Sequence, residues 1–553
     1  MTIQGIDIYE GNLDDPAAPS WTTILQGGFS FVLHRANESA RQDRAFAARW
    51  PQLATAGLLR GAYYLPRPDT VANYNALDSG LQVFVQTVGR LVPGDFGPML
   101  DLEDRKLMDD SNPVSNAAFW VDASKHLLEQ LETSLGRQPV IYTQRSWWVG
   151  YTNDARGFGQ YPLWVVDVNH ATAPVLPTDW ATWAWWQWHF EESTSAMPPP
   201  FRPGVDKGVD LNRFNGTLYE LRGLADMGRP SVATAVAGLP GIQSTTYIAQ
   251  TEIDGHLHLM VGPTLADNDL FSQLQSDPVL LLSGDSVYLY FRSGDHIVEA
   301  SSSASATGQW QTSNVEDAAP VHDPRAVATG TRRYLVYWSV DDDWYLLGAD
   351  DSWTNYGALL QEAGIKTTAG GGSSGQPNLY VNQDTLHVIG RVGQGGHLYD
   401  VWNDGTNWRG DDLTQLGRDL APQMPAATYC PCAYETSGGA GVVFRGVGGD
   451  LWVIRRADNA PTNLSSTTSA TTAIGSPTCL VFDDAPHIVY RGIDGGIYDI
   501  FLSGAAWAVQ QVCTRKAASD PAADAMGASA IAWRTPDGGI QLATLQSTGW
   551  SCQ

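Results

Sequence analysis

The stretch PMLDLED, residues 98–104, is a short apolar run that places two acids, Asp101 and Glu103, two positions apart. In a β-strand, residues i and i+2 point to the same face, so these two carboxylates would project together from the carboxyl end of the strand. In a β/α barrel, that end of the strands carries the active site. Two carboxylates there suit glycoside hydrolysis, in which one holds a proton and the other stays ionised. Solvated strand ends often show the same pair of acids by chance, so the rest of the chain must show whether this pair belongs to an active site.

The chain around this stretch alternates between predicted strands and predicted helices. The predicted strands are residues 5–9, 29–34, 61–65, 98–103, 139–142, 164–167 and 183–188, and the predicted helices are 21–26, 44–56, 71–91 and 116–135. Such alternation is typical of a largely parallel sheet covered by helices. Over about 220 residues it predicts a β/α (TIM-like) barrel, which we assign to residues 1–224.

Several predicted strands end in acids or aromatic residues. A buried strand that finishes in a carboxylate must pair it or expose it, so repeated use of this pattern indicates one shared polar pocket. Taken singly, each of these residues is more often structural. The residues are Asp7, Tyr63, Tyr64, Asp101, Glu103, Tyr142, Asp167, Trp186, Gln187 and Asp210.

The composition of the chain excludes several classes of partner. The 553 residues carry a net charge of −26, which repels nucleic acids and anionic membranes. No apolar run approaches the roughly 20 residues that span a bilayer. Trp and Tyr number 21 each, and their rings can stack on sugars. The N-terminus lacks a basic segment followed by an apolar one, so we expect no signal peptide.

The five cysteines all lie in the C-terminal half, at positions 430, 432, 479, 513 and 552. An odd number leaves at least one thiol unpaired within the chain. The spacing matches no zinc pattern, so we expect no metal site. A Cys513–Cys552 disulfide is left open by the sequence.

Residues 5–214 resemble glycoside hydrolase family 25, the lysozymes (N-acetylmuramidases) that are also found in phage endolysins. The matching motifs, in family order, are GID at 5–7, RANE at 35–38 with Asp43 and Phe46, AGL at 56–58 with GAY at 61–63, LDLE at 100–103, PVIYT at 139–143, LW at 163–164, WQ at 186–187 and VDLNRF at 209–214. The sequence departs from the family at Arg35 for a lysine, Ser39 for a glycine, Tyr64 for a histidine and residues 166–168 for a small residue-x-Tyr. These departures affect the rim and leave the four acids in place.

The resemblance implies a role for each of those acids. Glu103 would be the general acid that protonates the leaving oxygen and later the base toward water. The reaction would proceed with net retention, with the acetamido oxygen of the substrate as nucleophile, and Asp101 would stabilise the resulting oxazoline. Asp7 and Asp210 would hold hydrogen bonds and keep the pKa of Glu103 high through like charge.

The same resemblance implies a substrate-binding set formed by Tyr63, Tyr142, Trp186 and Arg35, and it implies no cofactor. For the three aromatic residues, ordinary core packing is an equally weighted interpretation.

The second half of the chain differs from the first in composition and in its sequence pattern. Small residues over 225–245 predict a linker. From 246 to 553 a strand, a Gly/Asp turn and a second strand recur at residues 253–259, 287–297, 334–344, 386–399, 442–452, 488–498 and 531–540. Repeats about 40 to 55 residues apart predict a β-propeller of seven blades, and six blades with a degenerate first unit is left open. The repeats resemble lectin-like propellers, which implies binding of glycans or cell surfaces. The recurring tryptophans would serve either as stacking platforms or as packing between blades.

Together these observations predict a peptidoglycan hydrolase that cleaves the β-1,4 bond between N-acetylmuramic acid and N-acetylglucosamine and is targeted by its propeller. We expect it to act outside the cell or after delivery to a target cell wall. One alternative is a non-catalytic carbohydrate-binding protein or adhesin with a remnant barrel, and another is a chitin-active hydrolase. Retention of all four acids favours the first interpretation.

Overall fold

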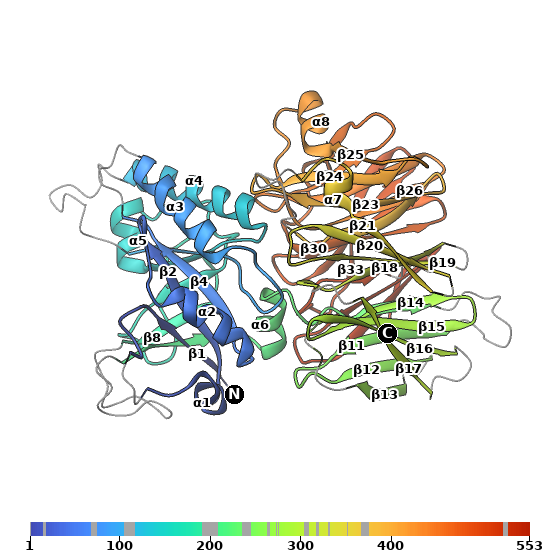
Figure 1. Cartoon of the computed structure of the whole chain (residues 1–553). Helices are drawn as coiled ribbons and strands as arrows, with labels where there is room; N and C mark the ends of the chain where they lie inside the picture. Colours follow the sequence, from blue (N-terminus) through green and yellow to red (C-terminus); the bar gives the residue numbers. More distant parts are fainter. Residues whose placement is uncertain are drawn as a thin grey trace. The chain divides into compact units, whose positions relative to one another are not determined.

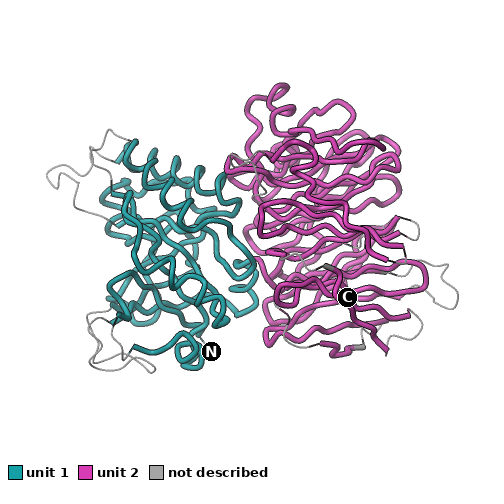
Figure 2. The backbone as a smooth tube through the Cα atoms, in the orientation of Figure 1, with its two compact units in different colours: residues 1–225 teal, residues 226–553 magenta. Residues whose placement is uncertain are grey.

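The structure is a computed structural model. It describes residues 2–14, 18–67, 74–103, 117–190, 208–234, 245–262, 266–271, 274, 276–303, 309–316, 320–329, 332–350, 352–366, 375–523 and 529–553. The chain forms two compact units, residues 1–225 and 226–553 (Figure 2). Each unit is described by itself.

The first unit is built on a closed barrel of eight strands. They are β1 (Ile3–Ile8), β2 (Phe29–Glu38), β4 (Leu59–Leu65), β5 (Met99–Leu102), β6 (Val140–Gln144), β7 (Leu163–Val166), β8 (Trp185–His189) and β9 (Asp210–Phe214). Around the barrel the order is β1-β9-β8-β7-β6-β5-β4-β2, and β2 pairs with β1 to close the ring. The short β3 (Arg41–Gln42) forms a hairpin with β2. The predicted TIM-like barrel is confirmed.

The eighth strand differs from the prediction, which ended the strands at residue 188. The strand β9 runs antiparallel to both of its neighbours, β1 and β8. Its sequence, DLNRF, carries polar residues on the inner face, so the apolar alternation that marks a strand is missing. Because β9 runs in the opposite direction, its first residue, Asp210, lies at the rim where the parallel strands end.

Helices cover the outside of the barrel. They are α1 (Trp21–Gln26), α2 (Phe46–Thr55), α3 (Tyr74–Val88), α4 (Ala117–Leu135), α5 (Arg145–Thr152) and α6 (Leu218–Leu224). The apolar stripe of α4 shows why it docks, because Leu127, Leu131 and Leu135 recur at i+4 and are all buried. Burying each leucine contributes about 1.5–3 kcal/mol. In Figure 1, α3 and α4 lie side by side. Residues 71–73 and 116 of the predicted helices are outside the described residues.

The second unit is a seven-bladed propeller of four-stranded antiparallel sheets, as predicted. The first four blades are β10 (Ser231–Thr234), β11 (Thr246–Thr251), β12 (Leu257–Val261) and β13 (Ala266–Phe271); β14 (Val279–Ser283), β15 (Ser286–Ser293), β16 (His296–Ser303) and β17 (Gln311–Glu316); β18 (Arg325–Thr329), β19 (Arg332–Trp338), β20 (Trp344–Ala349) and β21 (Trp353–Ala358); and β22 (Asn378–Asn382), β23 (Thr385–Val392), β24 (His397–Asn403) and β25 (Trp408–Asp412).

The remaining blades are β26 (Ala427–Thr436), β27 (Gly439–Gly446), β28 (Leu451–Arg455) and β29 (Pro461–Asn463); β30 (Ala473–Phe482), β31 (Ala485–Gly492), β32 (Ile497–Ser503) and β33 (Ala506–Cys513); and β34 (Ala522–Ala523), β35 (Ala530–Arg534), β36 (Ile540–Gln546) and β37 (Gly549–Cys552). Short helices α7 (Leu359–Glu362), α8 (Leu413–Leu420) and α9 (Leu464–Thr468) follow the third, fourth and fifth blades.

The first blade begins inside the range that was expected to be a linker, 225–245. Residues 231–234 form β10, which pairs with β11 over its whole length. The segment SVAT is too short and too rich in small residues to be recognised as a strand alone, and its ladder with β11 stabilises it. Residues 235–244 of the expected linker lie outside the described residues.

The recurring tryptophans lie where neighbouring blades meet. Trp353 of the third blade packs edge-on against Tyr290 of the second, with ring centroids 5.9 Å apart. Trp550 of the last blade donates its indole N–H to Asp499 of the sixth at 2.9 Å. The same placement holds for Trp310, Trp408 and Trp507, which pack against apolar clusters that join two blades. This arrangement favours the packing interpretation of these residues.

Buried arginines also connect successive blades. Arg391 donates to the carbonyl of Ala427 at 2.7 Å, and Arg445 donates to that of Ala473 at 2.8 Å. Arg534 of the last blade donates to the carbonyl of Thr251 in the first at 3.2 Å, and so connects the two ends of the ring.

Two disulfides hold the C-terminal blades. Cys513–Cys552, which the sequence left open, joins the fourth strands of the sixth and seventh blades. Cys432–Cys479 joins the first strands of the fifth and sixth blades, and Cys430 is a buried free thiol.

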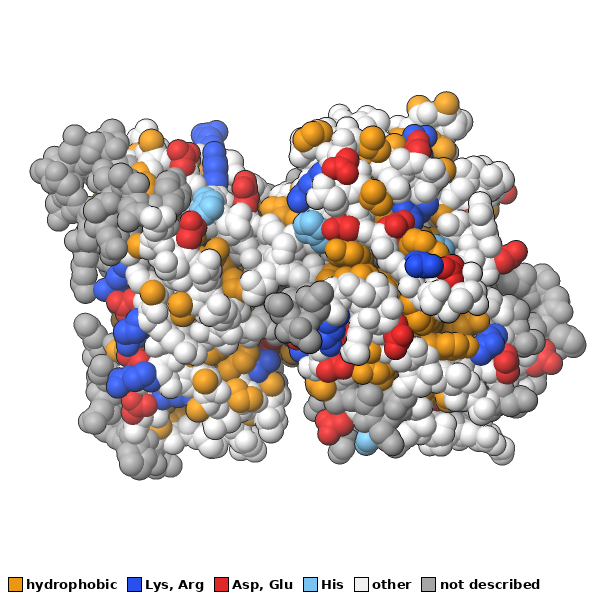
Figure 3. Space-filling view, turned by 45° about the horizontal axis from the view of Figure 1, so that its top comes forward, with side chains coloured by type: hydrophobic (Ala, Val, Ile, Leu, Met, Phe, Trp, Pro, Cys, Tyr) orange, Lys and Arg blue, Asp and Glu red, His pale blue; other side chains and the backbone are white. Residues whose placement is uncertain are grey.

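Among the described helices, none is long and apolar enough to cross a membrane. On the face drawn in Figure 3, acidic and basic side chains are interspersed on both units.

Candidate functional site

A cavity of about 280 Å³ opens where the barrel strands end. Its lining brings together seven of the eight predicted site residues. The lining residues are Asp7, Tyr9, Asn12, Arg35, Tyr63, Leu65, Arg67, Asp101, Glu103, Tyr142, Trp164, Gln187, Phe190 and Asp210. In a β/α barrel this rim is the place where side chains from several strands can meet around one substrate.

Asp7 and Asp210 face each other across the β1–β9 ladder, where they are directly paired residues. Each carboxylate accepts a hydrogen bond from a side-chain amide, from Asn212 Nδ2 to Asp7 at 2.6 Å and from Gln187 Nε2 to Asp210 at 2.5 Å. Asn212 in turn accepts the indole N–H of Trp164 at 2.8 Å. These contacts fix the two acids in neighbouring positions.

Asp101 and Glu103 come from the end of β5, as their spacing predicts. Asp101 is buried with 4% of its surface exposed, whereas Glu103 directly follows the strand and is exposed. The Tyr142 hydroxyl donates to Glu103 Oε2 at 3.3 Å. The arrangement therefore provides one carboxyl that can reach a bound substrate and a second that lies deeper on the same strand.

Three aromatic residues form the wall between these acids. The Trp164 ring lies 4.4 Å from Tyr142 and 5.7 Å from Tyr63, measured between centroids. Burial raises the pKa of Tyr63 and Tyr142 well above the usual range, and the charges of neighbouring carboxylates add to the effect. Both phenols are consequently neutral at ordinary pH, and each keeps a proton to donate.

Two arginines stand on another part of the rim. The Arg35 guanidinium lies 4.7 Å from the centre of the Tyr9 ring and 3.4 Å from carboxylate oxygens of Glu38 and Asp43. Arg67 Nη1 is 2.8 Å from Glu38 Oε1. Glu38 thus positions both guanidiniums, and both line the cavity.

Trp186 does not line the cavity, unlike the other predicted residues. Its side chain is buried in the apolar core and donates its indole N–H to the carbonyl of Asp167 at 2.7 Å. Neighbouring residues of a strand point to opposite faces, so Gln187 faces the cavity and Trp186 faces the covering layer. The prediction that Trp186 lines a sugar site is therefore corrected, and Gln187 takes that place.

Several lining residues were not predicted as part of the site. Asn212 lies two positions after Asp210 and so shares its face, a signal that recognition of β9 as a strand would have supplied. Arg67 follows the end of β4 in a loop and has no such signal. Asn12 reaches the cavity through a turn, in which its side chain accepts the N–H of Tyr9 at 2.8 Å.

This arrangement suits acid–base chemistry on an uncharged bond. It combines an exposed carboxyl, a buried carboxyl on the same strand, two carboxylates that accept hydrogen bonds from side-chain amides, and neutral phenol donors. In the part of the chain that the structure describes, no three His, Cys, Asp or Glu side chains group in a way that could hold a metal ion.

Comparison with known proteins identifies the family to which the barrel is similar. The model of the glycosyl hydrolases family 25 matches residues 6–197. Lysozyme M1 of Streptomyces globisporus is 29% identical over 235 residues, which cover 40% of this chain and 71% of that protein. The uncharacterized protein YegX of Escherichia coli K12 is 30% identical over 229 residues, covering 41% of this chain and 74% of that protein.

Among solved structures, the BP39L lectin of Burkholderia pseudomallei is similar to this chain with a TM-score of 0.46 and 12% identity, covering 59% of this chain and 98% of the lectin. The family match and the extent of the sequence relatives concern the barrel and its ordered motifs. Through its barrel unit the chain belongs to the glycosyl hydrolases family 25, and it is a glycoside hydrolase.

Proposed function

We propose that the barrel is an N-acetylmuramidase that cleaves the β-1,4 bond between N-acetylmuramic acid and N-acetylglucosamine in peptidoglycan. The observation that carries this proposal is the meeting of Asp7, Asp101, Glu103 and Asp210 around one cavity at the carboxyl rim. The name of a relative, Lysozyme M1, points to the same substrate class.

Glu103 is the proposed general acid and base, because it is exposed at the rim. A hydrogen bond from the Tyr142 hydroxyl to Oε2 orients its carboxyl group. Glu103 protonates the leaving glycosidic oxygen while the acetamido oxygen of the substrate attacks the anomeric carbon. The glycosidic bond breaks and an oxazoline forms. Glu103 then takes a proton from water, which opens the oxazoline with overall retention.

Asp101 is the proposed partner of the oxazoline. It lies below Glu103 on the same face of β5 and is buried, so its charge acts in a poorly solvated place. Positive charge develops on the acetamido nitrogen during the first step, and a carboxylate there stabilises it. Asp7 and Asp210, fixed by Asn212 and Gln187, complete the polar floor.

The two rim arginines support peptidoglycan over chitin as the substrate. Muramic acid carries a lactyl carboxylate and the wall carries peptide carboxylates, whereas chitin is uncharged. Arg35 and Arg67 offer planar donors that fit a carboxylate. We expect Arg67→Gln to raise KM for wall fragments about tenfold and to leave KM for neutral chitin oligomers unchanged.

We further propose that the propeller holds the enzyme on a glycan of the target wall, and that the protein acts outside the cell or after delivery to that wall. The propeller is a compact unit of its own, which is what a targeting module requires. Its recurring tryptophans are engaged between blades, so the ligand is expected elsewhere on its surface. Glycan-array binding by the full-length Glu103→Gln variant tests this assignment.

The experiment that tests the enzymatic assignment is digestion of purified peptidoglycan followed by mass spectrometry of the products. We expect muropeptides that end in reducing N-acetylmuramic acid, initially as the retained anomer by NMR. Glu103→Gln should release none, while Glu129→Gln, on the exposed side of α4, should match the wild type. Undiminished hydrolysis by Glu103→Gln would overturn the assignment. Failure of the wild type on several wall types would favour the binding-protein alternative.

A further inference from the structure

The first strands of the seven blades surround a central channel of about 400 Å³. Where each of these strands enters its continuous pairing with the second strand, the sequence repeats one feature, a residue directly followed by proline; in β26 and β30 this point lies inside the strand, at a break in the pairing. The seven residues are Arg229, Asp277, Asp323, Gln376, Cys430, Ser476 and Asp520. Proline fixes the entry into the strand, so these residues occupy equivalent positions at one mouth of the channel.

Hydrogen bonds join neighbouring members of this ring. Asp277 accepts the backbone N–H groups of Gly228 and Arg229 at 2.8 and 2.9 Å. Gln376 donates to the carbonyl of Asp323 at 2.6 Å. On the other side of the ring, Cys430 N–H donates to Ser476 Oγ at 3.2 Å, and Ser476 N–H donates to Asp520 at 2.7 Å. The mouth is therefore a built structure with defined side-chain positions.

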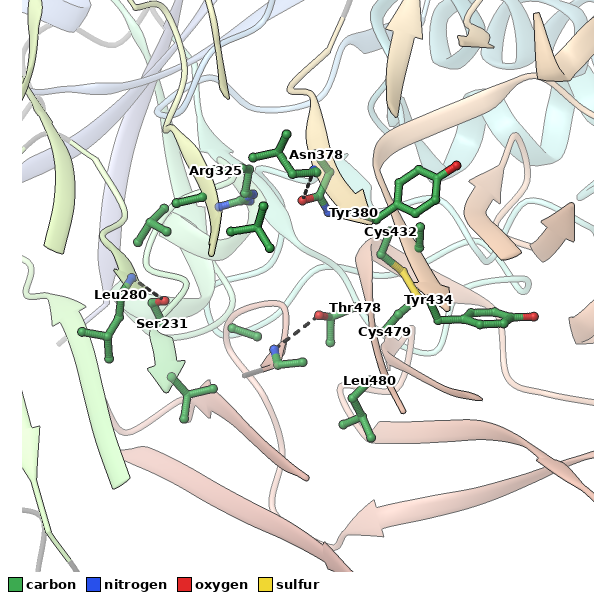
Figure 4. A pocket seen from close by; sticks show the side chains of 18 of the residues that line it. Ser231, Leu280, Arg325, Asn378, Tyr380, Cys432, Tyr434, Thr478, Cys479 and Leu480 are labelled. Atoms are coloured by element: carbon green, nitrogen blue, oxygen red, sulfur yellow. Dashed lines mark hydrogen bonds between the residues drawn. A yellow bond between two sulfur atoms is a disulfide. The ribbon is translucent and has the colours of Figure 1, made fainter. Parts of the chain in front are cut away.

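Two guanidiniums at this mouth line the channel, those of Arg229 and Arg325, the first residue of β18. Figure 4 shows Arg325 among the lining side chains, with Ser231, Asn378 and Thr478 contributed by other blades. Arg325 donates to the neutral amide oxygen of Gln376 at 2.9 Å. For the Arg229 guanidinium, the structure gives no hydrogen bond or ion pair among the described residues.

Acidic groups near the mouth offset part of this charge: Asp277 and Asp520 both favour the charged form of Arg229, and each has further partners. Asp520 is paired with Arg491 at 2.9 Å. The oxygens of Asp277 accept the two backbone N–H groups described above. Burial raises the pKa of Asp323 to about 8, so this acid is largely protonated at neutral pH.

Two effects disfavour the charged form of Arg229. Burial lowers the pKa of Arg229, and the nearby charge of Arg325 lowers it further. Two like charges in a poorly solvated place favour an anion between them. With a net charge of −26, the protein as a whole repels anions, so attraction at this mouth would be a local property.

We propose that the mouth of the central channel is a binding site for one small oxyanion, a phosphate or a carboxylate, held by Arg229 and Arg325. A guanidinium presents paired N–H donors that match two oxygens of such a group. Ser231, Asn378 and Thr478 add polar groups along the wall, and the volume accommodates a single sugar acid as well as a free ion. This site is independent of the barrel and of its proposed substrate.

Isothermal titration of the full-length protein with inorganic phosphate tests the proposal. We expect saturable one-to-one binding that added salt weakens, and a loss of about tenfold or more in affinity for Arg229→Gln and for Arg325→Gln. Arg409→Gln is the matched control, because Arg409 is an exposed arginine of the fourth blade paired with Asp404. Absence of saturable binding at millimolar concentrations, or equal affinity in all variants, would overturn the site.

A second arm identifies the source of the oxyanion. N-acetylmuramic acid and neutral N-acetylglucosamine are titrated in the same way. Binding of the acid alone assigns the site to a sugar carboxylate, and binding of phosphate alone assigns it to a free inorganic anion; both outcomes support the proposal. Equal binding of the acid and the neutral sugar contradicts charge recognition.

A measurement on the wild type covers the case in which the variants do not fold. Phenylglyoxal modifies arginine, and mass spectrometry reports the rate at each position. Phosphate should slow modification of Arg229 and Arg325 and leave Arg409 unchanged. Equal rates at all three with and without phosphate would contradict the proposal.

Discussion

The barrel and the propeller both bury acids among aromatic residues, yet they use them differently. In the barrel, Asp101 and Glu103 lie beside an open cavity. In the propeller, Asp499 is fully buried, and one of its oxygens is contacted by His487 at 2.8 Å, Gln510 at 3.0 Å and Trp550 at 2.9 Å. Trp550 comes from the next blade, so this acid holds two blades together.

The difference shows that residue type and recurrence do not distinguish a site from packing. What distinguishes them is whether the side chain faces a space that a ligand can enter. Trp164 and Trp550 both donate their indole N–H groups to polar side chains; Trp164 lines the barrel cavity, and Trp550 bonds to the neighbouring blade. The following predictions test this distinction, beginning with the largest effect.

Asp499→Ala should destabilise the propeller by about 3 kcal/mol, because it leaves one buried and two partly buried donors without their acceptor. Calorimetry should show a lowered transition for the propeller, while hydrolysis of peptidoglycan by the folded protein is unchanged. Asp483→Asn, at an exposed position of the same blade, is the control and should change neither. Unaltered stability of the Asp499 variant would show that the contact between blades contributes little.

Asp101→Asn should produce the opposite pattern. Loss of the charge beneath the substrate should lower kcat by about 10²–10³-fold and leave both unfolding transitions in place. Initial rates on purified wall provide the measurement, with Asp122→Asn on the exposed face of α4 as the control. A rate within twofold of the wild type would remove Asp101 from the site.

The two units should also respond to pH in opposite directions. Burial lowers the pKa of His34 in the barrel from 6.5 to about 3. Below pH 6.5 the unfolded chain binds a proton at this histidine that the folded barrel excludes, so barrel stability should fall as the pH drops from about 6.5 toward 3. His34→Gln should flatten this part of the profile.

In the propeller, burial raises the pKa of Asp323 from 3.8 to about 8. The folded propeller keeps this proton over a range in which the unfolded chain has lost it. Propeller stability should therefore fall as the pH rises from about 4 to about 8. Calorimetry across both windows measures the two slopes, and Asp323→Asn should reduce the second. An unchanged slope in that variant would contradict the assignment.

The smallest predicted effect is a difference in activity between variants of two tryptophans on neighbouring barrel strands. Trp164→Phe removes the hydrogen bond that orients Asn212 and through it Asp7, so activity should fall by up to about tenfold. Trp186→Phe changes the outward packing and removes the hydrogen bond to the carbonyl of Asp167, so it should lower stability and leave activity within about twofold. An equal loss of activity in both variants would argue that the two residues are not distinguished by strand face.

Much of this outcome follows from local patterns. The i, i+2 spacing places Asp101 and Glu103 on one face of β5, and strand ends converge at one rim in any β/α barrel, so Asp7, Tyr63 and Tyr142 could be assigned to the same pocket without coordinates. The repeated strand–turn–strand unit likewise predicts the seven blades.

Other features could not be predicted from the sequence, because their signals are weak or depend on distant segments. The strand β9 has polar residues on its inner face, and β10 has only small residues, so neither shows the alternation of a strand. Trp186 was assigned to the wrong face because it lies one position from Gln187, and a shift of one residue reverses the direction of the side chain. The Cys432–Cys479 pairing joins residues 47 positions apart in different blades.

The sequence by itself therefore determined the two architectures and the acids that end the barrel strands, since periodicity and repetition are properties of neighbouring residues. The tertiary structure alone decided which tryptophans lie between blades, that Arg67 borders the cavity, and that seven residues before prolines meet around one channel. Residues such as Arg229 and Arg325 are far apart in the chain, and only closure of the ring brings their charges together. Such proximity depends on the whole fold, and no local pattern encodes it.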